Sequence, residues 1–481
     1  MRIDEYARYD AVGLAALIRC GEISPQEAID CAVGAVEALN PKLNAVVELF
    51  EDRRRGGDPE ANLAGPLGGV PFFLKDLGAG EEGRKSEMGS RIFRGFVNDK
   101  TSYLTKRFKR AGLVILGRTT TPEAGFAGTT ESVATGKTRN PWNVDRSSGG
   151  SSGGASSLVA AGVVPLAHGS DGAGSIRIPA SLCGLVGLKP TRGRVSFGPD
   201  FDEPGFGCMV EFALTRTVRD TAVLLDEVAG PYVGDPFTVP RPATSWLDAL
   251  EAPQRKLRVA FSTTNWFTGE RVPAELAAAV HQTARDLSDM GHGVEEATPV
   301  FDTAMAYGVN RFAFYSMMLL LGPYAAALGV PVDEEHAEPV ILDAYRKMQS
   351  MTLGEFAVQT LGFNMVRRQI GEFFETYDLL VTPSIAVPHV EFDTLDCSSF
   401  KTADEFREAT DRTLAAFTCP INVTGQPAIS LPLAWKDERS PIGVHLVARM
   451  AEEGVLLRIA AAFEEQRPWR DRIAPVHASR I

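Results

Sequence analysis

The sequence has little of what metal, disulfide or nucleic-acid chemistry usually requires. Its six cysteines are widely scattered and form no Cys-x-x-Cys pair, which argues against a zinc site or a disulfide framework and favours a reducing cytoplasm. The 49 basic and 61 acidic side chains give a net charge of −12, whereas binding to nucleic-acid phosphates depends on clustered Lys and Arg. We therefore expect no metal, no other cofactor and no nucleic-acid partner.

Long uninterrupted apolar runs are also missing. The N-terminus, MRIDEYARYDAVG, carries acids where an export signal needs a positive end and an apolar stretch. The most apolar later stretch, residues 312–332, contains Ser316, Gly322 and Pro323 and falls short of the ~20 apolar residues of a membrane span. It is interpreted as core or pocket wall, and a cytoplasmic protein without membrane contact is predicted.

What is present is typical of a folded α/β protein, with 44% hydrophobic and 23% charged residues. Ser24, Pro25 and Glu27 form the start signals of a helix predicted over 25–39. Periodicity predicts further helices near 104–111, 218–228 and 273–290, and buried strands at 113–116, 257–261 and 378–381. The one basic cluster, Lys106–Arg110, is interpreted as a solvated helix face. This alternation predicts a sheet with helices on both faces.

The domain count is left open by length and composition. A prior of ~150 residues per domain suggests about three domains, but the 46 glycines and 30 prolines mark no linker, so one large unit is equally allowed. The sequence contains no repeat of fixed period, which sets solenoids and propellers aside.

Residues 147–157, SSGGSSGGASS, are the compositional outlier of the chain. A flexible linker is one interpretation. The phosphate-binding and dinucleotide-binding glycine motifs both fail on spacing. Gly149, Ser151 and Gly153 match the Gly-x-Ser-x-Gly elbow of α/β-hydrolases, but the late histidines, His445 and His477, carry no flanking signature of a catalytic partner.

Two further segments suggest nucleophilic catalysis. In Asp171-Gly-Ala-Gly-Ser175, small residues before a serine can direct several N–H groups at one oxygen, as an oxyanion hole does, although a turn closing a buried strand is the simpler alternative. Lys75 ends the apolar run that starts at Gly69, where burial would disfavour its charge and make it usable as a base. Its simpler interpretation is a surface lysine at a strand end.

Together these segments resemble the amidase signature family. The blocks GVPFFLKD, RNPWNVDRSSGGSSGG, GSDGAGSIRIPASLCGLVGLKPTRGRVS, TVRD and NVTGQPAISLP occur in that family's order and cover most of the length. The family uses a lysine, a serine after a cis peptide bond and a nucleophilic serine 24 residues later, and Ser175 stands 24 residues after Ser151. The resemblance implies one domain over 1–481, with N-terminal helices at about 1–60, a core at about 65–230 and a large mixed twisted sheet between helices.

The resemblance also implies a role for each residue of the site. Neutral Lys75 is the base, Ser151 relays the proton, and Ser175 attacks the amide to form an acyl-enzyme. The supporting residues are Ser152, which holds the lysine, Asp171 and Arg177, which pair beneath the site, and Gly172, Ala173, Gly174 and Ser175, whose backbone N–H groups bind the oxyanion. The family's usual Asp-Thr-Gly-Gly-Ser reads Asp-Gly-Ala-Gly-Ser here, and His445 stands where glutamine is usual.

The expected activity is that of a cofactor-independent amidase, which cleaves a small-molecule amide to an acid and ammonia or an amine. The turn AHGSDGAGS resembles the branch of bacterial amidases that includes 6-aminohexanoate cyclic dimer hydrolase. The ammonia-supplying component of glutaminyl-tRNA amidotransferase and a non-catalytic binding protein are the alternatives, and the resemblance suggests a homodimer. Aromatic residues around Phe314 are interpreted either as pocket wall or as plain core, and Arg311 either binds a carboxylate or reaches solvent.

Overall fold

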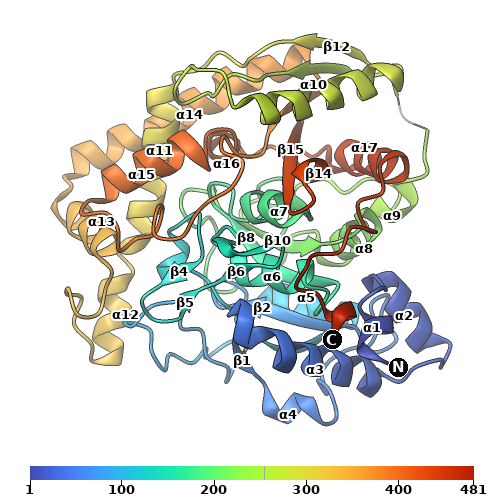
Figure 1. Cartoon of the computed structure of the whole chain (residues 1–481). Coiled ribbons are helices and arrows are strands. Elements are labelled where there is room, and N and C mark those ends of the chain that lie inside the picture. The colour runs from blue at the N-terminus through green and yellow to red at the C-terminus, as the bar shows by residue number, and fades with distance from the viewer. Residues whose placement is uncertain (254) are drawn as a thin grey trace.

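A mixed eight-stranded β-sheet runs through the computed structural model of the chain, which describes residues 1–253 and 255–481 (Figure 1). The two pairings at one edge, β12 with β11 and β11 with β13, are parallel, and the other pairings are antiparallel. This is the predicted mixed sheet. In spatial order its strands are β12 (Gly293–Glu296), β11 (Arg258–Phe261), β13 (Leu379–Pro383), β15 (Ser440–Ala448), β14 (Ala428–Asp437), β9 (Val186–Lys189), β10 (Val210–Thr215) and β8 (Leu166–Asp171).

The remaining strands form one three-stranded sheet and two short hairpins. The three-stranded sheet has the order β1 (Val46–Leu49), β3 (Val114–Thr119), β2 (Pro71–Lys75), and β2 packs against β8 of the large sheet. The hairpins are β4 (Glu131–Ser132) with β5 (Gly136–Lys137) and β6 (Arg139–Asn140) with β7 (Asn143–Ser147). Because β1 pairs with β3, the segment 1–60, expected to supply helices, also supplies a strand.

Helices cover the sheet on several sides (Figure 1). One group lies on the left of Figure 1: α11 (Thr303–Met318), α12 (Leu321–Leu328), α13 (Pro339–Ser350), α14 (Leu353–Thr376), α15 (Ala403–Thr413) and α16 (Thr418–Thr424). A second group lies on the right: α8 (Val218–Val228), α9 (Trp246–Ala249) and α17 (Glu453–Gln466), with α10 (Ala274–Asp289) above. The others are α1 (Ile3–Tyr6), α2 (Ala11–Arg19), α3 (Pro25–Leu43), α4 (Glu51–Arg54), α5 (Tyr103–Ala111), α6 (Gly153–Ala160), α7 (Arg177–Cys183) and the 3₁₀ turns η1 (Glu123–Gly125) and η2 (Ala478–Arg480).

Local signals fix where the predicted elements begin. Ser24 caps α3: its hydroxyl accepts the N–H of Glu27 at 3.2 Å, and the Glu27 carboxylate accepts the N–H of Ser24 at 2.8 Å. The helix starts where predicted and continues four residues further, to a left-handed Asn44. The prediction for 218–228 coincides with α8, and those for 273–290 and 378–381 match α10 and β13 to within two residues.

The prediction that Lys106–Arg110 is a solvated face is wrong for two of its residues. Arg107 and Lys109 are buried. The Arg107 guanidinium donates to the carbonyl of Val228, and the Lys109 ammonium pairs with Glu60 and Glu81. All three partners lie far away in the sequence, so the local pattern does not indicate these contacts.

The stretch predicted as core or pocket wall falls on α11 and α12. By length and composition alone, residues Thr303–Leu328 could cross a membrane. However, α11 packs against α13, α14 and α16 and buries most of its aromatic side chains, including Phe312, Phe314 and Tyr315. This packing is typical of a core helix of a globular protein.

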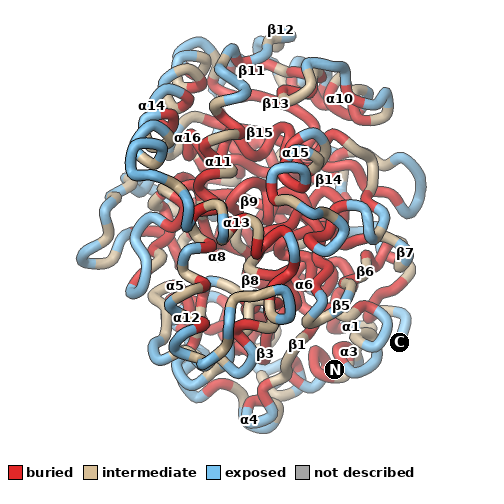
Figure 2. The backbone as a smooth tube through the Cα atoms, turned by 90° about the vertical axis from the view of Figure 1, so that its left-hand side faces the viewer, coloured by how far each residue is buried: buried red, intermediate tan, exposed pale blue. Residues whose placement is uncertain are grey.

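The most deeply buried backbone surrounds the middle of the sheet. Every residue of α7 is buried, and the helix packs against β9, β14 and β15, which lie in the largely buried centre of Figure 2. The short turn that leads into α7 is therefore held against buried elements.

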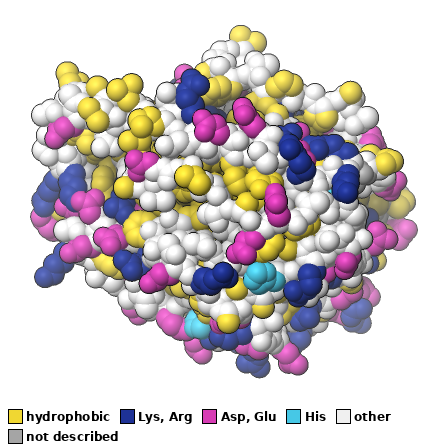
Figure 3. Space-filling view, turned by 90° about the horizontal axis from the view of Figure 1, so that it is seen from above, with side chains coloured by type: hydrophobic (Ala, Val, Ile, Leu, Met, Phe, Trp, Pro, Cys, Tyr) yellow, Lys and Arg dark blue, Asp and Glu magenta, His cyan; other side chains and the backbone are white. Residues whose placement is uncertain are grey.

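Seen from above, the surface mixes acidic and basic side chains, and no large area carries charge of one sign (Figure 3).

Candidate active site

Three chain segments end next to one another beside the sheet. Lys75 is the last residue of β2, Ser151 and Ser152 immediately precede α6, and Ser175 lies in the turn that joins β8 to α7. β2 packs against β8, and α6 packs against both strands. The fold therefore brings together residues that are about 25 and 75 positions apart in the sequence.

The Lys75 amine is buried among three serine hydroxyls. Its Nζ lies 2.7 Å from Ser151 Oγ, 3.1 Å from Ser152 Oγ and 2.9 Å from Ser170 Oγ. The side chain is almost inaccessible, with 2% of the residue exposed, and this burial lowers the pKa of Lys75 to about 7 against the raising effect of Glu211 and Asp171.

A neutral amine can satisfy these three contacts. Ser152 Oγ donates to the carbonyl of Ser170 at 3.2 Å, so it meets Lys75 as an acceptor. Nζ can then donate to Ser152 and Ser170 and turn its lone pair toward Ser151. A neutral lysine so oriented accepts a proton from the Ser151 hydroxyl.

The turn that carries Ser151 is held by backbone contacts on several sides. The Gly150–Ser151 peptide bond is cis. The Thr121 hydroxyl donates to the carbonyl of Ser151 at 3.0 Å, and the Thr130 hydroxyl donates to the carbonyl of Gly149 at 2.8 Å. A Cβ at position 150 would lie 2.3 Å from the carbonyl oxygen of Thr129, so only glycine fits there. The glycine-rich segment is thus a packed turn and not a flexible linker.

The turn before Ser175 presents backbone donors on one side because its carbonyls are held on the other. Asn310 Nδ2 donates to the carbonyl of Gly172 at 3.1 Å, and the Thr418 hydroxyl donates to the carbonyl of Ala173 at 2.6 Å. The expectation for Gly174 needs correction: its N–H donates to Asp171 Oδ1 at 2.7 Å and is already used. Within the described residues, the N–H groups of Gly172, Ala173 and Ser175 have no hydrogen-bond partner.

Beneath the turn lies a fully buried ion pair. Arg177 donates twice to Asp171, at 2.9 Å each, and Asn422 Nδ2 also donates to Asp171 at 2.9 Å. These contacts hold the pKa of Asp171 well below its usual range. His445 has a structural place here: its Nε2 lies 3.0 Å from Arg177 Nη1, and burial lowers its pKa, so the neutral ring accepts from the guanidinium.

Of the three expected catalytic residues, Lys75, Ser151 and Ser175, only Ser175 has a side chain that makes no hydrogen bond to the other two within the described residues. Among the described residues, no hydrogen bond joins its hydroxyl to Ser151, although its carbonyl accepts the N–H of Ser152 at 3.3 Å. Part of the residue, 7%, is exposed, whereas Lys75 and Ser151 are at 2%. Such contacts are often long in ligand-free enzymes and tighten when substrate binds.

Comparison with known proteins shows the family to which a chain with this site belongs. A family model for amidases matches residues 27–457. The chain belongs to the amidase family. It is 37% identical over 473 residues to the 6-aminohexanoate-cyclic-dimer hydrolase of Paenarthrobacter ureafaciens, covering 96% of this chain and 95% of the relative, and 33% identical to the acylamidase of Rhodococcus erythropolis, covering 96% of each. The amidase also superimposes on a solved structure of 6-aminohexanoate cyclic dimer hydrolase complexed with substrate, with a TM-score of 0.89, 35% identity and coverage of 98% of this chain and 99% of that one. It is an amide-hydrolysing enzyme.

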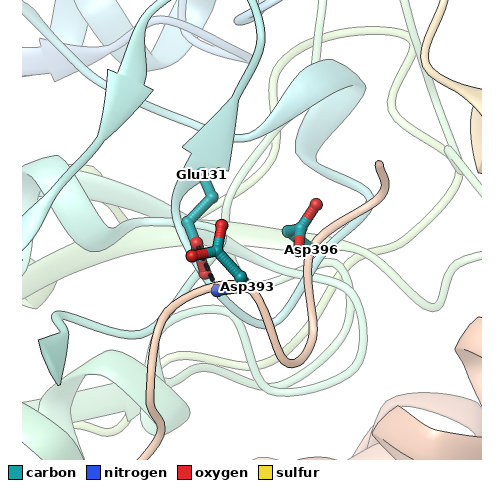
Figure 4. Close-up of side chains that lie close together, drawn as sticks. All are labelled: Glu131, Asp393 and Asp396. Atoms are coloured by element: carbon teal, nitrogen blue, oxygen red, sulfur yellow. Dashed lines mark hydrogen bonds between the residues drawn. The ribbon is translucent and has the colours of Figure 1, made fainter. Parts of the chain in front are cut away.

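One group of acidic residues in the amidase has the spacing of a cation site. Oxygens of Glu131, Asp393 and Asp396 lie within 4.8 Å of one another, on β4 and the loop that precedes α15 (Figure 4). Asp393 is mostly exposed and binds Lys137 at 2.6 Å, and Asp396 accepts the N–H groups of Ser398 and Ser399. The two aspartates are thus already paired within the protein, so the group does not require a metal.

Aromatic side chains line the far side of the turn that precedes Ser175. A Cβ at Gly172 would lie 2.9 Å from the Phe314 ring, and Phe126 packs edge-on against Phe314 with ring centres 5.7 Å apart. The nearby Arg311 binds Asp411 at 2.9 Å, which answers the question left open by the sequence. The guanidinium of Arg407 lies 4.5 Å from the centre of the Phe314 ring and is also paired with Asp411, at 3.5 Å.

Sequence patterns missed several residues that support the site. Ser170 stands two residues after His168 in the segment AHGSDGAGS, and its alternation with the strand could have placed it beside the lysine. Asn310, Thr418 and Asn422 are more than 130 residues from the turn that they hold. Isolated polar residues on otherwise apolar helices were the only available signal.

The Asp171–Arg177 pair predicts a large stability effect. The Asp171→Ala variant leaves the fully buried guanidinium of Arg177 without its counter-ion, so we expect its free energy of unfolding to fall by about 3–5 kcal/mol. The Glu408→Ala variant, which breaks an exposed pair with Arg412 on α15, should lose less than about 1 kcal/mol. Denaturant titration followed by tryptophan fluorescence measures both, and equal losses would contradict the account.

Proposed function

We propose that this amidase hydrolyses neutral carboxylic amides through an acyl-enzyme on Ser175, with Lys75 as the base and Ser151 as the proton relay. The observation that carries the proposal is the buried Lys75 amine, whose Nζ lies 2.7–3.1 Å from the hydroxyl oxygens of Ser151, Ser152 and Ser170. A lysine stripped of water and hydrogen-bonded to a hydroxyl is suited to remove a proton from it.

The reaction follows in two halves. Ser151 passes its proton to Lys75 and receives the proton of Ser175, whose oxygen forms a bond to the amide carbon. The N–H groups of Gly172, Ala173 and Ser175 stabilise the negative charge that develops on the amide oxygen. The C–N bond then breaks, and the departing nitrogen takes a proton returned from Lys75 through Ser151. Water hydrolyses the acyl-Ser175 ester by the same proton path.

The aromatic wall formed by Phe126 and Phe314 favours an uncharged substrate. Phe126 and Phe314 offer apolar surface, and Arg311 and Arg407 are both engaged by Asp411. Moving an uncharged amide from water to this apolar surface costs much less than moving a free ammonium or carboxylate. The cyclic dimer of 6-aminohexanoate, which has two amide bonds and no charged group, is such a compound.

A substrate panel tests this assignment. The purified chain alone, with chelator present, should hydrolyse the 6-aminohexanoate cyclic dimer and simple neutral amides with a kcat/KM at least about 100-fold above that for L-glutamine. A preference for glutamine, or activity that appears only with added partner proteins, would contradict the proposal and support an amidotransferase component instead.

We also propose that the enzyme acts in the cytoplasm and needs no cofactor. All six cysteines are free, five of them buried, as suits a reducing compartment. The proposed mechanism uses serine and lysine side chains and backbone N–H groups alone.

A further inference from the structure

Behind the turn that carries the proposed oxyanion donors lies a charged side chain that the mechanism does not use. Arg407 of α15 is buried, with 1% of the residue exposed. Its Nη2 lies 2.8 Å from Asn310 Oδ1 and 3.5 Å from Asp411 Oδ1, and its guanidinium lies 4.5 Å from the centre of the Phe314 ring. Asn310 and Phe314 are one turn apart on α11, and both lie against Gly172. One buried arginine therefore contacts both of these neighbours of Gly172.

The orientation of the Asn310 amide is fixed by its two partners. A guanidinium can only donate hydrogen bonds, so the atom of Asn310 that faces Arg407 is Oδ1. Nδ2 is then the atom that faces the carbonyl of Gly172, to which it donates at 3.1 Å. Arg407 thus turns the donor side of Asn310 toward the oxyanion turn.

This bond sets the direction of the N–H group that follows. The Gly172 carbonyl and the Ala173 N–H belong to one trans peptide group, so they point in opposite directions. Within the described residues, no donor other than Asn310 reaches this carbonyl, and the Ala173 N–H has no partner. A hydrogen bond to a carbonyl also polarises the peptide group and makes its N–H a stronger donor. Asn310 therefore both directs and strengthens the Ala173 N–H.

The rest of the turn is held by other groups. The Thr418 hydroxyl donates to the carbonyl of Ala173 at 2.6 Å, and Asp171 accepts the N–H of Gly174 at 2.7 Å. Neither contact involves Asn310. Loss of Asn310 should therefore disturb the peptide group before Ala173 and leave the rest of the turn in place.

We propose that Asn310 and Arg407 are positioning residues for amide hydrolysis: Arg407 orients the Asn310 amide, and Asn310 holds the turn so that the Ala173 N–H faces the negative oxygen of the tetrahedral intermediate. Both side chains are buried and act through the backbone of the turn. This inference rests on the proposed acyl-enzyme mechanism on Ser175, in which such an oxygen forms.

The Asn310→Leu variant tests this role. It removes the donor to Gly172 with little change in side-chain size, so kcat on the 6-aminohexanoate cyclic dimer should fall by about 10- to 100-fold while KM changes by less than about threefold. The affinity for phenylboronic acid, which adds to a serine hydroxyl as a tetrahedral anion, should fall by a similar factor, because that anion needs the same donors. A wild-type kcat, or a lower kcat with unchanged boronic acid affinity, would overturn the inference.

Another buried asparagine provides the matched control. Asn140 Nδ2 donates to the carbonyl of Leu182 at 2.8 Å, at the C-terminal end of α7 and outside the turn. The Asn140→Leu variant should keep the kcat and the boronic acid affinity of the wild type, and losses equal to those of Asn310→Leu would overturn the inference.

A variant of Asn310 with the same side-chain shape covers the case in which Asn310→Leu does not fold. Asn310→Asp keeps an oxygen for Arg407 and replaces the donor to Gly172 by a second oxygen. Its kcat should fall by at least the factor expected for Asn310→Leu. A wild-type kcat in Asn310→Asp would overturn the inference.

A double-mutant cycle tests whether Arg407 acts through Asn310. Arg407→Met should lower kcat by about 10-fold, because the Asn310 amide is then free to turn its oxygen toward Gly172. Asp411 keeps Arg311 as its partner at 2.9 Å in this variant. Adding Arg407→Met to Asn310→Leu should change kcat by less than about threefold, and a loss equal to the product of the two single losses would overturn this part of the inference.

The Ser175→Ala variant separates this inference from the proposed function. If Ser175→Ala keeps its activity, the acyl-enzyme mechanism fails and the proposed function fails with it. If Ser175→Ala is inactive while Asn310→Leu turns over like the wild type, the mechanism stands and only the positioning role is wrong.

Discussion

The Ser175→Ala variant should lose amide hydrolysis by a factor of about 10⁴ to 10⁶ in kcat, because the bond that forms to the substrate has no other oxygen to form it. The fold should be unaffected, since among the described residues the Ser175 hydroxyl makes no hydrogen bond to the protein. Steady-state rates on the 6-aminohexanoate cyclic dimer, with circular dichroism of the variant, measure both expectations.

The helix that follows Ser175, α7, supplies a matched control for this loss. Ser181 is a buried serine of α7, and its hydroxyl accepts the N–H of Gly443 at 3.0 Å. The Ser181→Ala variant should lose about 1 kcal/mol of stability and keep its kcat within about threefold. Residual turnover above about 1% in Ser175→Ala would show that another group is the nucleophile.

The Lys75→Met variant should lose activity by a factor of about 10³ to 10⁴, because the relay through Ser151 then has no acceptor. The ionisation of Lys75 should also shape the pH dependence of kcat/KM in the wild-type enzyme. Burial lowers the pKa of Lys75 to about 7, and only the neutral amine accepts a proton. The kcat/KM should therefore fall as the pH drops below about 7 and be level just above it.

A second buried lysine provides the comparison. Lys189 on β9 is as inaccessible as Lys75, and burial lowers its pKa to about 7 as well, but its Nζ donates to the carbonyl of Pro190 and to no serine. The Lys189→Met variant should keep the acid limb where the wild type has it. If the acid limb disappeared in Lys189→Met and remained in Lys75→Met, Lys189 would be the base and the account would be wrong.

Much of the fold could be predicted because its signals are local. The capping residues of α3 lie within four positions of one another, and the apolar periodicity of α8 and α10 is complete within each helix. Strand β1 was missed because its identity depends on pairing with β3, about 70 residues away. The burial of Arg107 and Lys109 was missed for the same reason, since Arg107 binds a distant carbonyl and Lys109 binds distant carboxylates that a local pattern cannot reveal.

The candidate site likewise has features that are local in the sequence and features that depend on the fold. The 24-residue spacing of Ser151 and Ser175 and the apolar run that ends at Lys75 could be read directly. The use of the Gly174 N–H by Asp171 could not, because it depends on how the turn folds back on the end of its own strand. The place of His445 beside Arg177 could not either, since those residues meet only when β15 lies against α7.

The most direct test of the account is the position of the acyl group during turnover. The enzyme is mixed with an activated ester that carries an uncharged acyl group, and the reaction is stopped with acid. The acyl group should then remain on Ser175. Because Ser151 and Ser175 both lie between Arg146 and Arg177, with no Lys or Arg between them, one tryptic peptide carries both serines, and fragment-ion mass spectrometry must distinguish them. The account predicts the acyl mass on Ser175 in the wild type and its absence in Ser175→Ala. An acyl group on Ser151 would contradict it.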